Sequence, residues 1–182
     1  MPRDYNYDIL PEIKTRYAVK NFSEEKLARE ELLPLIEAAR YAPSAFNEQP
    51  WRFILGDDEA THGKIADTLA AGNAWAKKAP VLLLILTKTP FAYNGKPNAH
   101  SRFDAGCASG FLQLEAARRG LVSHCMSGFD ANKARELLSV PEEYDIIAVL
   151  ALGKPANLDA LPEELRKLEE PGTRNPLDSF IL

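Results

Sequence analysis

A length of 182 residues, 46% of them hydrophobic and 26% charged, suits a single globular domain and argues against a disordered or fibrous chain. A formal net charge of −4 without any block of like charges argues against broad electrostatic binding to nucleic acid or to anionic lipid. No apolar run approaches the roughly 20 residues of a membrane span, there is no signal-peptide core, and the two cysteines form no CxxC pair, so we expect a reduced, cytoplasmic protein.

The spacing of apolar residues predicts helices and strands in alternation. Apolar positions at helical spacing predict helices over residues 29–41, 61–69, 102–119 and 132–138. Short apolar runs predict strands over residues 52–55, 81–86 and 146–152, with another just before residue 125, and the run at 81–86 is expected to be buried on both faces. Pro34 is expected in the first turn of its helix, where a missing N–H costs least. The pattern predicts an α/β or α+β sandwich.

Two stretches predict contacts beyond an ordinary core. The third predicted helix has Gly106 and Gly110 among small residues at its centre, which weaken a helix unless another helix approaches closely. That neighbour is either a helix of the same chain or one of a second subunit. Residues 154–182 are polar and contain proline but end in an apolar tip. We therefore expect an extension of the 1–153 core, in the same domain, that reaches across something to dock.

Motifs for several common chemistries are absent from the sequence. There is no GxGxxG and no GxxxxGK[ST], which argues against a Rossmann dinucleotide turn and against a P-loop. HExxH and GxSxG are also missing. His62, His100 and His124 are widely spaced, so we interpret each as an ordinary surface or packing histidine and expect no metal site.

Three polar clusters are not needed to build a core. In the first, Arg16 and Lys20 lie four residues apart and can both point at one anion, although such a pair is also common on a solvated surface. The second, residues 42–51, sets a hydroxyl and two amides between two prolines. This arrangement suits either recognition of a planar heterocycle edge or a locally capped turn. In the third, Gly128 permits a ligand to approach closely, while Asp130 can cap the helix that follows.

Taken in order and at this spacing, the three clusters resemble the FMN-dependent nitroreductase family. The likeness runs from about Arg16 to the C-terminus, and its most specific part is residues 39–53, which include APSAFNEQPW. The tail sequence RNPL, which begins at Arg174, supports it. The resemblance implies an α+β sandwich with a central mixed sheet flanked by helices. It also implies a homodimer with FMN at two interface sites and a C-terminal tail exchanged with the partner subunit.

The resemblance also implies which residues bind FMN. They are Arg16, Tyr17, Ala18, Lys20, Pro43, Ser44, Ala45, Asn47, Gln49, Asn73, Ser127, Gly128 and Arg174. The two arginines are expected at the phosphate, Lys20 near the ribityl chain and pyrimidine end, and residues 43–49 on the partner's side of the site. Ser127 and Gly128 are expected to face the flavin N5. Ala18 and Gly172 stand where relatives often have a serine and a cation, so a weaker hold on the phosphate is expected.

The implied activity is a ping-pong transfer of hydride from NAD(P)H through flavin N5 to an electron-poor small molecule of nitroaromatic or quinone type, without a catalytic side chain. Phe46, Phe91, Tyr93 and His100 are expected either to shape the substrate site or to be plain loop residues. The alternatives are a non-catalytic FMN-binding redox sensor, a flavin dehydrogenase or reductive dehalogenase of the same fold, and a dimer without a cofactor.

Overall fold

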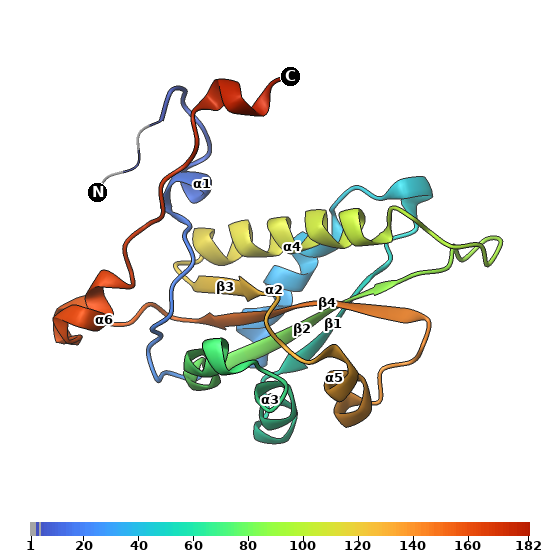
Figure 1. Cartoon of the computed structure of the whole chain (residues 1–182), viewed down its shortest axis with the longest axis horizontal. Coiled ribbons are helices and arrows are strands. Elements are labelled where there is room, and N and C mark those ends of the chain that lie inside the picture. The colour runs from blue at the N-terminus through green and yellow to red at the C-terminus, as the bar shows by residue number, and fades with distance from the viewer. Residues whose placement is uncertain (1–2, 4) are drawn as a thin grey trace.

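The computed structural model describes residue 3 and residues 5–182, and this part of the chain is built as a sheet between two layers of helices (Figure 1). The four-stranded sheet has the order β1-β2-β4-β3. Its strands are β1 (Trp51–Gly56), β2 (Val81–Lys88), β3 (Val122–Met126) and β4 (Tyr144–Gly153). One face is covered by α2 (Arg29–Arg40) and α4 (Ser101–Arg118), the other by α3 (Glu59–Ala66) and α5 (Ala131–Leu138). The predicted α+β sandwich is confirmed.

The remaining helical segments are short. They are α1 (Pro11–Thr15), α6 (Glu163–Lys167) and the 3₁₀ segments η1 (Ala45–Asn47), η2 (Ala71–Lys78), η3 (Leu158–Ala160) and η4 (Leu177–Phe180). The periodic pattern did not predict them, because they bury little apolar surface. Across the described residues, no helix combines the length and the apolar character needed to cross a membrane.

The central strand β2 is buried on both faces, as its apolar run predicts. Alternate side chains of a strand point to opposite faces. Val81, Leu83 and Ile85 therefore pack with α2 and α4, while the leucines between them pack with α3, α5 and η2. The two hydrophobic cores are thus joined through one strand, which fixes the two helical layers relative to each other.

The expected mixture of parallel and antiparallel pairs is wrong for the described strands, because every pair in the sheet is antiparallel. Strands β2 and β3 run in the same direction and are connected through α4. They are not neighbours, since β4 lies between them and runs antiparallel to both. The return of β4 into this gap removes the parallel contact.

Pro34 also lies elsewhere than expected, in the second turn of α2 rather than the first, because the helix begins at Arg29. Proline removes one helical hydrogen bond at that point. Leu32, Leu35 and Ala39 are buried against the sheet and α4, and this packing holds the helix together across the missing bond. The packing of this buried face therefore offsets the hydrogen bond that Pro34 removes.

Glu115, close to the end of α4, gives a pH-dependent test of the fold. Hydrogen bonds from Arg118, together with those from Arg119, lower the pKa of its carboxyl to about 2. Because this folded-state pKa lies below the ordinary value of 4.5, the pairing stabilises the fold above about pH 4.5 and is lost as the pH falls towards 2. We expect Glu115→Gln to lower the melting temperature at pH 7, and the difference from the unaltered protein to shrink as the pH drops to about 3.

Circular dichroism melts across that pH range measure the effect. Glu136→Gln is the matched control, since this exposed carboxylate has no bonded partner in the described part of the chain. A gap between Glu115→Gln and the unaltered protein that stays constant with pH would contradict the assignment.

Candidate functional site

The two ends of the chain meet beside the C-terminal half of α4. The N-terminal segment that contains α1 lies next to the tail that ends in η4 (Figure 1). Between them and α4 is a cavity of about 940 Å³, whose wall includes Gly110 and Gln113 of α4. Helix α1 runs from Pro11 to Thr15 and is capped by Arg16, whose backbone N–H donates to the carbonyl of Glu12. The end of this short helix places the Arg16 side chain in the cavity wall.

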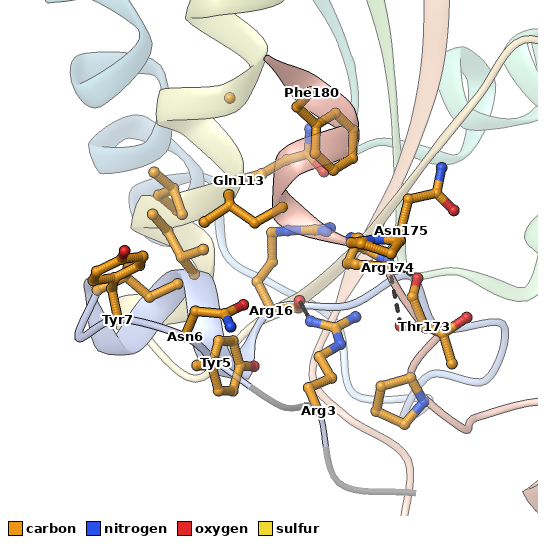
Figure 2. Close-up of a pocket in the computed structure, with 18 residues that line it drawn as sticks. Arg3, Tyr5, Asn6, Tyr7, Arg16, Gln113, Thr173, Arg174, Asn175 and Phe180 are labelled. Carbon is orange, nitrogen blue, oxygen red and sulfur yellow. Dashed lines mark hydrogen bonds between the residues drawn. The ribbon is translucent and has the colours of Figure 1, made fainter.

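Positive charge dominates the wall of this cavity. Arg3, Arg16 and Arg174 all line it, and none of its described lining residues is an aspartate or a glutamate. Figure 2 shows the three arginines close together, from the N-terminal segment and from the tail. Burial lowers the pKa of Arg16, and the neighbouring charges of Arg3 and Arg174 lower it further. The three side chains therefore repel one another, and an anion bound between them relieves that repulsion.

A buried carboxylate, Glu169, fastens the tail to the segment that contains Arg16. Its side chain is 4% exposed. Oxygen Oε1 accepts hydrogen bonds from the backbone N–H of Lys20 at 2.9 Å, from the N–H of Asn21 at 3.0 Å and from Nδ2 of Asn21 at 2.7 Å. These bonds to a charged acceptor are of the strong class. They hold the tail at Glu169, five residues before Arg174, against the N-terminal segment at Lys20, four residues after Arg16.

His124 and Trp75 continue this surface towards the other face of the sheet. The Nδ1 atom of His124 lies 2.7 Å from the carbonyl oxygen of Val19, and its ring centroid is 4.6 Å from that of Trp75. Burial lowers the pKa of His124, and the charges of Lys20 and Arg16 lower it as well. The histidine thus packs between the segment that contains the cations and η2, which is consistent with a packing role.

Asn73 and Gly128 form the next contact along this surface. Nδ2 of Asn73 donates to the carbonyl oxygen of Gly128 at 2.8 Å. A Cβ atom added to Gly128 would lie only 2.6 Å from that nitrogen, so the close approach requires glycine. Ser127 beside it is exposed. Asn73 is therefore in contact with the turn formed by Ser127 and Gly128, which the resemblance expects to face the flavin.

Residues 43–49 lie at the other end of α4. The backbone N–H of Ala45 donates to Asp104, in the first turn of α4, at 3.1 Å. Asp104 precedes Gln113 of the cavity wall by nine residues, which is about 14 Å along a helix. Within one chain, this loop and the chain ends that carry the arginines lie at opposite ends of the same helix (Figure 1).

The loop of residues 43–49 contains a locally capped turn and three residues with strained, left-handed backbone conformations. Ser44 Oγ accepts from the N–H of Gln49 at 3.0 Å, as expected for a locally capped turn. Phe46, Asn47 and Gln49 have positive φ angles of 53°, 56° and 47°. Bulky residues rarely adopt this conformation, and it is typical of functional segments. Phe46 is nevertheless 79% exposed, so the strain does not bury its ring.

The predicted residues thus fall into three groups within one chain. Arg16 and Arg174 line the cavity between the chain ends, while Tyr17, Ala18 and Lys20 follow Arg16 on the same segment and are not among its described lining residues. Asn73 pairs with Gly128 beside Ser127. The loop residues lie apart from both groups and are Pro43, Ser44, Ala45, Asn47 and Gln49. Arg3 and Glu169 are not predicted from the sequence, because a single charged residue near a chain end has no pattern that marks it. Within residues 3 and 5–182, no three histidine, cysteine, aspartate or glutamate side chains are grouped so that they could hold a metal ion.

Comparison with known proteins adds a family match and related structures. A family model described as the nitroreductase family matches residues 13–74 and 68–154. Protein DrgA of Synechocystis sp. is 32% identical over 176 residues, covering 81% of this chain and 84% of its own. Iodotyrosine deiodinase of Thermotoga neapolitana is 28% identical over 166 residues, covering 78% and 86%. A crystal structure of an oxidoreductase containing FMN has a TM-score of 0.90 and 32% identity, over 99% of this chain and 93% of the other.

The contact between Asn73 and Gly128 predicts the effect of one added methyl group. Gly128→Ala would force the flexible end of the part-buried Asn73 side chain away and break its hydrogen bond, so we expect the free energy of unfolding to fall by about 0.5–1.5 kcal/mol. Gly63→Ala is the control, because an added Cβ there meets nothing within 4 Å and α3 gains helix propensity of up to about 1 kcal/mol. Urea denaturation measures both, and a Gly128→Ala protein as stable as the unaltered one would contradict the contact.

Proposed function

Since the chain belongs to the nitroreductase family, we propose that it is an FMN-dependent oxidoreductase that passes hydride from NAD(P)H to an electron-poor small molecule of nitroaromatic or quinone type. The proposal depends above all on the convergence of Arg16 and Arg174 in a cavity with no carboxylate among its described lining residues. FMN ends in a phosphate with nearly two negative charges, and paired guanidinium groups are the side chains best suited to hold it.

The other groups of residues fit the rest of this cofactor. Lys20 follows Arg16 on the same segment, and its backbone is held in place by Glu169. The amide of Asn73 and the backbone of Gly128 offer fixed polar atoms beside Trp75, which a planar heterocycle requires along its edge. This fit supports the assignment of Arg16, Tyr17, Ala18, Lys20, Asn73, Ser127, Gly128 and Arg174 to one side of the FMN site.

The chemistry divides between cofactor and protein. When bound, FMN supplies two-electron exchange, taking a hydride from NAD(P)H and giving it to the acceptor in turn. The chain's own side chains bind and orient. Arg16 and Arg174 neutralise the phosphate, and Lys20 supplies a positive charge that favours electron uptake by the bound ring. No side chain of this chain has to act as a nucleophile, which agrees with the missing hydrolase motifs.

The proposal also requires a second copy of the chain. Phe103 and Phe111 on the outer side of α4 are 71% and 40% exposed. A Cβ added to Gly106 or Gly110 on the same helix meets none of the described atoms within 4 Å, so no helix crossing within the described part of the chain explains those glycines. Packing of two copies through α4 would bring residues 43–49 of one chain to the arginine cluster of the other. Residues 154–182, with an exposed Ile181 and Leu182, are proposed to extend over the partner.

An aromatic cluster is proposed to receive the acceptor. Phe46 lies 5.8 Å from Phe91 and 5.7 Å from Tyr93 between ring centroids, and Phe91 and Tyr93 are 5.3 Å apart. Glu48 joins the two loops by accepting a hydrogen bond from the N–H of Ala92 at 2.8 Å. Exposed rings held in this way can stack with a planar aromatic substrate. His100 is exposed at the start of α4, and no contact places it with these rings.

Arginine substitutions test the phosphate assignment. Each of Arg16→Ala and Arg174→Ala removes charge-assisted hydrogen bonds, so we expect the Kd for FMN to rise by about ten- to a hundredfold. Flavin fluorescence titration of the apo-protein measures it. Lys167→Ala is the control, because it removes the same charge from the exposed tail helix, where Lys167 pairs with Glu163. Normal FMN affinity in the Arg16→Ala, Arg174→Ala double variant would reject the assignment.

Turnover separates an enzyme from a redox sensor. The FMN-loaded protein is expected to oxidise NADH or NADPH continuously with a nitroaromatic or a quinone present, followed at the nicotinamide absorbance. A protein that is reduced once and then stops would favour the sensor.

Because Gly106 faces open space on α4, replacing it with alanine is predicted to stabilise an isolated chain but to weaken a dimer packed through α4. In an isolated chain, Gly106→Ala would stabilise α4 by up to about 1 kcal/mol. In the proposed dimer the added methyl meets the partner, so we expect the dimer to dissociate at a higher protein concentration. Sedimentation equilibrium measures this, with Gly63→Ala as the control on a helix away from the interface. A Gly106→Ala protein with unchanged self-association would contradict the proposed packing.

A further inference from the structure

Arg3 brings a third guanidinium group to the arginine cluster, from a segment outside the residues that the family model matches. Its Nη1 atom donates to the carbonyl oxygen of Arg16 at 2.8 Å. Figure 2 shows its side chain rising from the N-terminal segment towards Arg16 and Arg174. The hydrogen bond fixes the guanidinium at the cavity wall, where Arg16 and Arg174 also lie.

The hydrogen bonding of Arg3 is incomplete. Its Nε atom is buried and has no hydrogen-bond partner among the described residues. A buried N–H of a charged group is costly without an acceptor. The Arg16 carbonyl satisfies only one of the five N–H groups of a guanidinium. The buried Nε of Arg3 therefore lacks an acceptor, which an anion bound in the cavity would supply.

The charges around Arg3 identify the kind of acceptor. Several other arginines of the chain pair with carboxylates, as Arg29 does with Asp57 and Arg118 with Glu115. Arg3 instead faces Arg16, whose pKa its charge helps to lower after the larger effect of burial. With no described acidic residue in the cavity wall, the arrangement favours a compact anion with several oxygens over any protein group.

We propose that Arg3 is a third direct ligand of the phosphate, closing from the N-terminal segment over an anion held by Arg16 and Arg174. This inference rests on the proposed function, because it takes the phosphate to be that of FMN. Arg3 then acts as a specificity residue: it favours FMN over riboflavin, which has the same ring and ribityl chain but no phosphate.

A purely structural role for Arg3 makes a different prediction. If the hydrogen bond to Arg16 only orders the N-terminal segment, a neutral donor of similar reach can replace it. Arg3→Gln keeps an N–H donor and removes the charge, whereas Arg3→Lys keeps the charge and loses the planar fork. The pair of variants therefore separates hydrogen bonding within the chain from attraction to an anion.

Titration of the full-length apo-protein with FMN and with riboflavin tests the proposal. We expect Arg3→Ala and Arg3→Gln to raise the Kd for FMN by at least about tenfold and to leave the Kd for riboflavin within about twofold. Arg3→Lys should recover part of the FMN affinity. Lys26→Ala, which removes an exposed cation outside the cavity, should bind both flavins normally. Circular dichroism melts check that each variant is folded.

Several outcomes would overturn the proposal. Normal FMN affinity in a folded Arg3→Gln protein would show that Arg3 has only a structural role. An equal loss of affinity for FMN and for riboflavin would show that Arg3 acts through the fold and not on the phosphate. Calorimetric titration with inorganic phosphate separates this inference from the proposed function. Phosphate binding that weakens in Arg3→Gln, in a protein that takes up neither flavin, would support the Arg3 site and reject FMN. An FMN affinity that is unchanged in Arg3→Gln would reject the role of Arg3 and leave the proposed FMN-dependent function in place.

Discussion

Mutual repulsion among arginines is the constraint that the architecture beside α4 has to meet. Arg3, Arg16 and Arg174 share one cavity wall without a described carboxylate, and their charges oppose one another. The fold keeps them together by fastening the backbone rather than by pairing the side chains. Glu169 contributes most to this: its buried carboxylate accepts three hydrogen bonds from Lys20 and Asn21, on the segment that follows Arg16. The side chains are left with unused capacity for an anion.

This site exists only in the completed fold, because its parts come from the two ends of the chain. The bond from Lys20 to Glu169 joins residues 149 positions apart. Helix α4 is the common support, with the strained loop at its first turn and the arginine cavity along its last turns. A symmetric dimer uses the same surface of both copies. Two antiparallel α4 helices would therefore place each loop of residues 43–49 beside the other chain's arginines. Such packing would explain why the loop and the arginines lie at opposite ends of α4 in one chain, and why Gly106 and Gly110 face open space.

The sequence predicts the parts of this protein that obey a regular period or a compact motif. The helices over α2 and α4 and the doubly buried strand β2 follow from apolar spacing, since burial repeats along them. The antiparallel sheet was not predicted, because the insertion of β4 between β2 and β3 depends on contacts distant in sequence. The resemblance names Asn73 and Gly128 separately as expected flavin-binding residues, but their contact with each other is seen only in the structure. Arg3 and Glu169 have no neighbouring pattern, and only the folded chain brings them to the site.

A motif counts only the cations at the positions that the motif defines. Gly172 and Ala18 lack the side chains that relatives often place there, so the resemblance alone implies a looser hold. Gly172 nevertheless lines the same cavity as Arg3, which reaches it from the opposite end of the chain. Attraction to an anion depends on where a guanidinium lies in space and not on the segment that supplies it. A cation that is missing at Gly172 in the tail can therefore be offset by Arg3 in the N-terminal segment. A family motif within residues 13–154 does not include Arg3 and cannot predict this compensation.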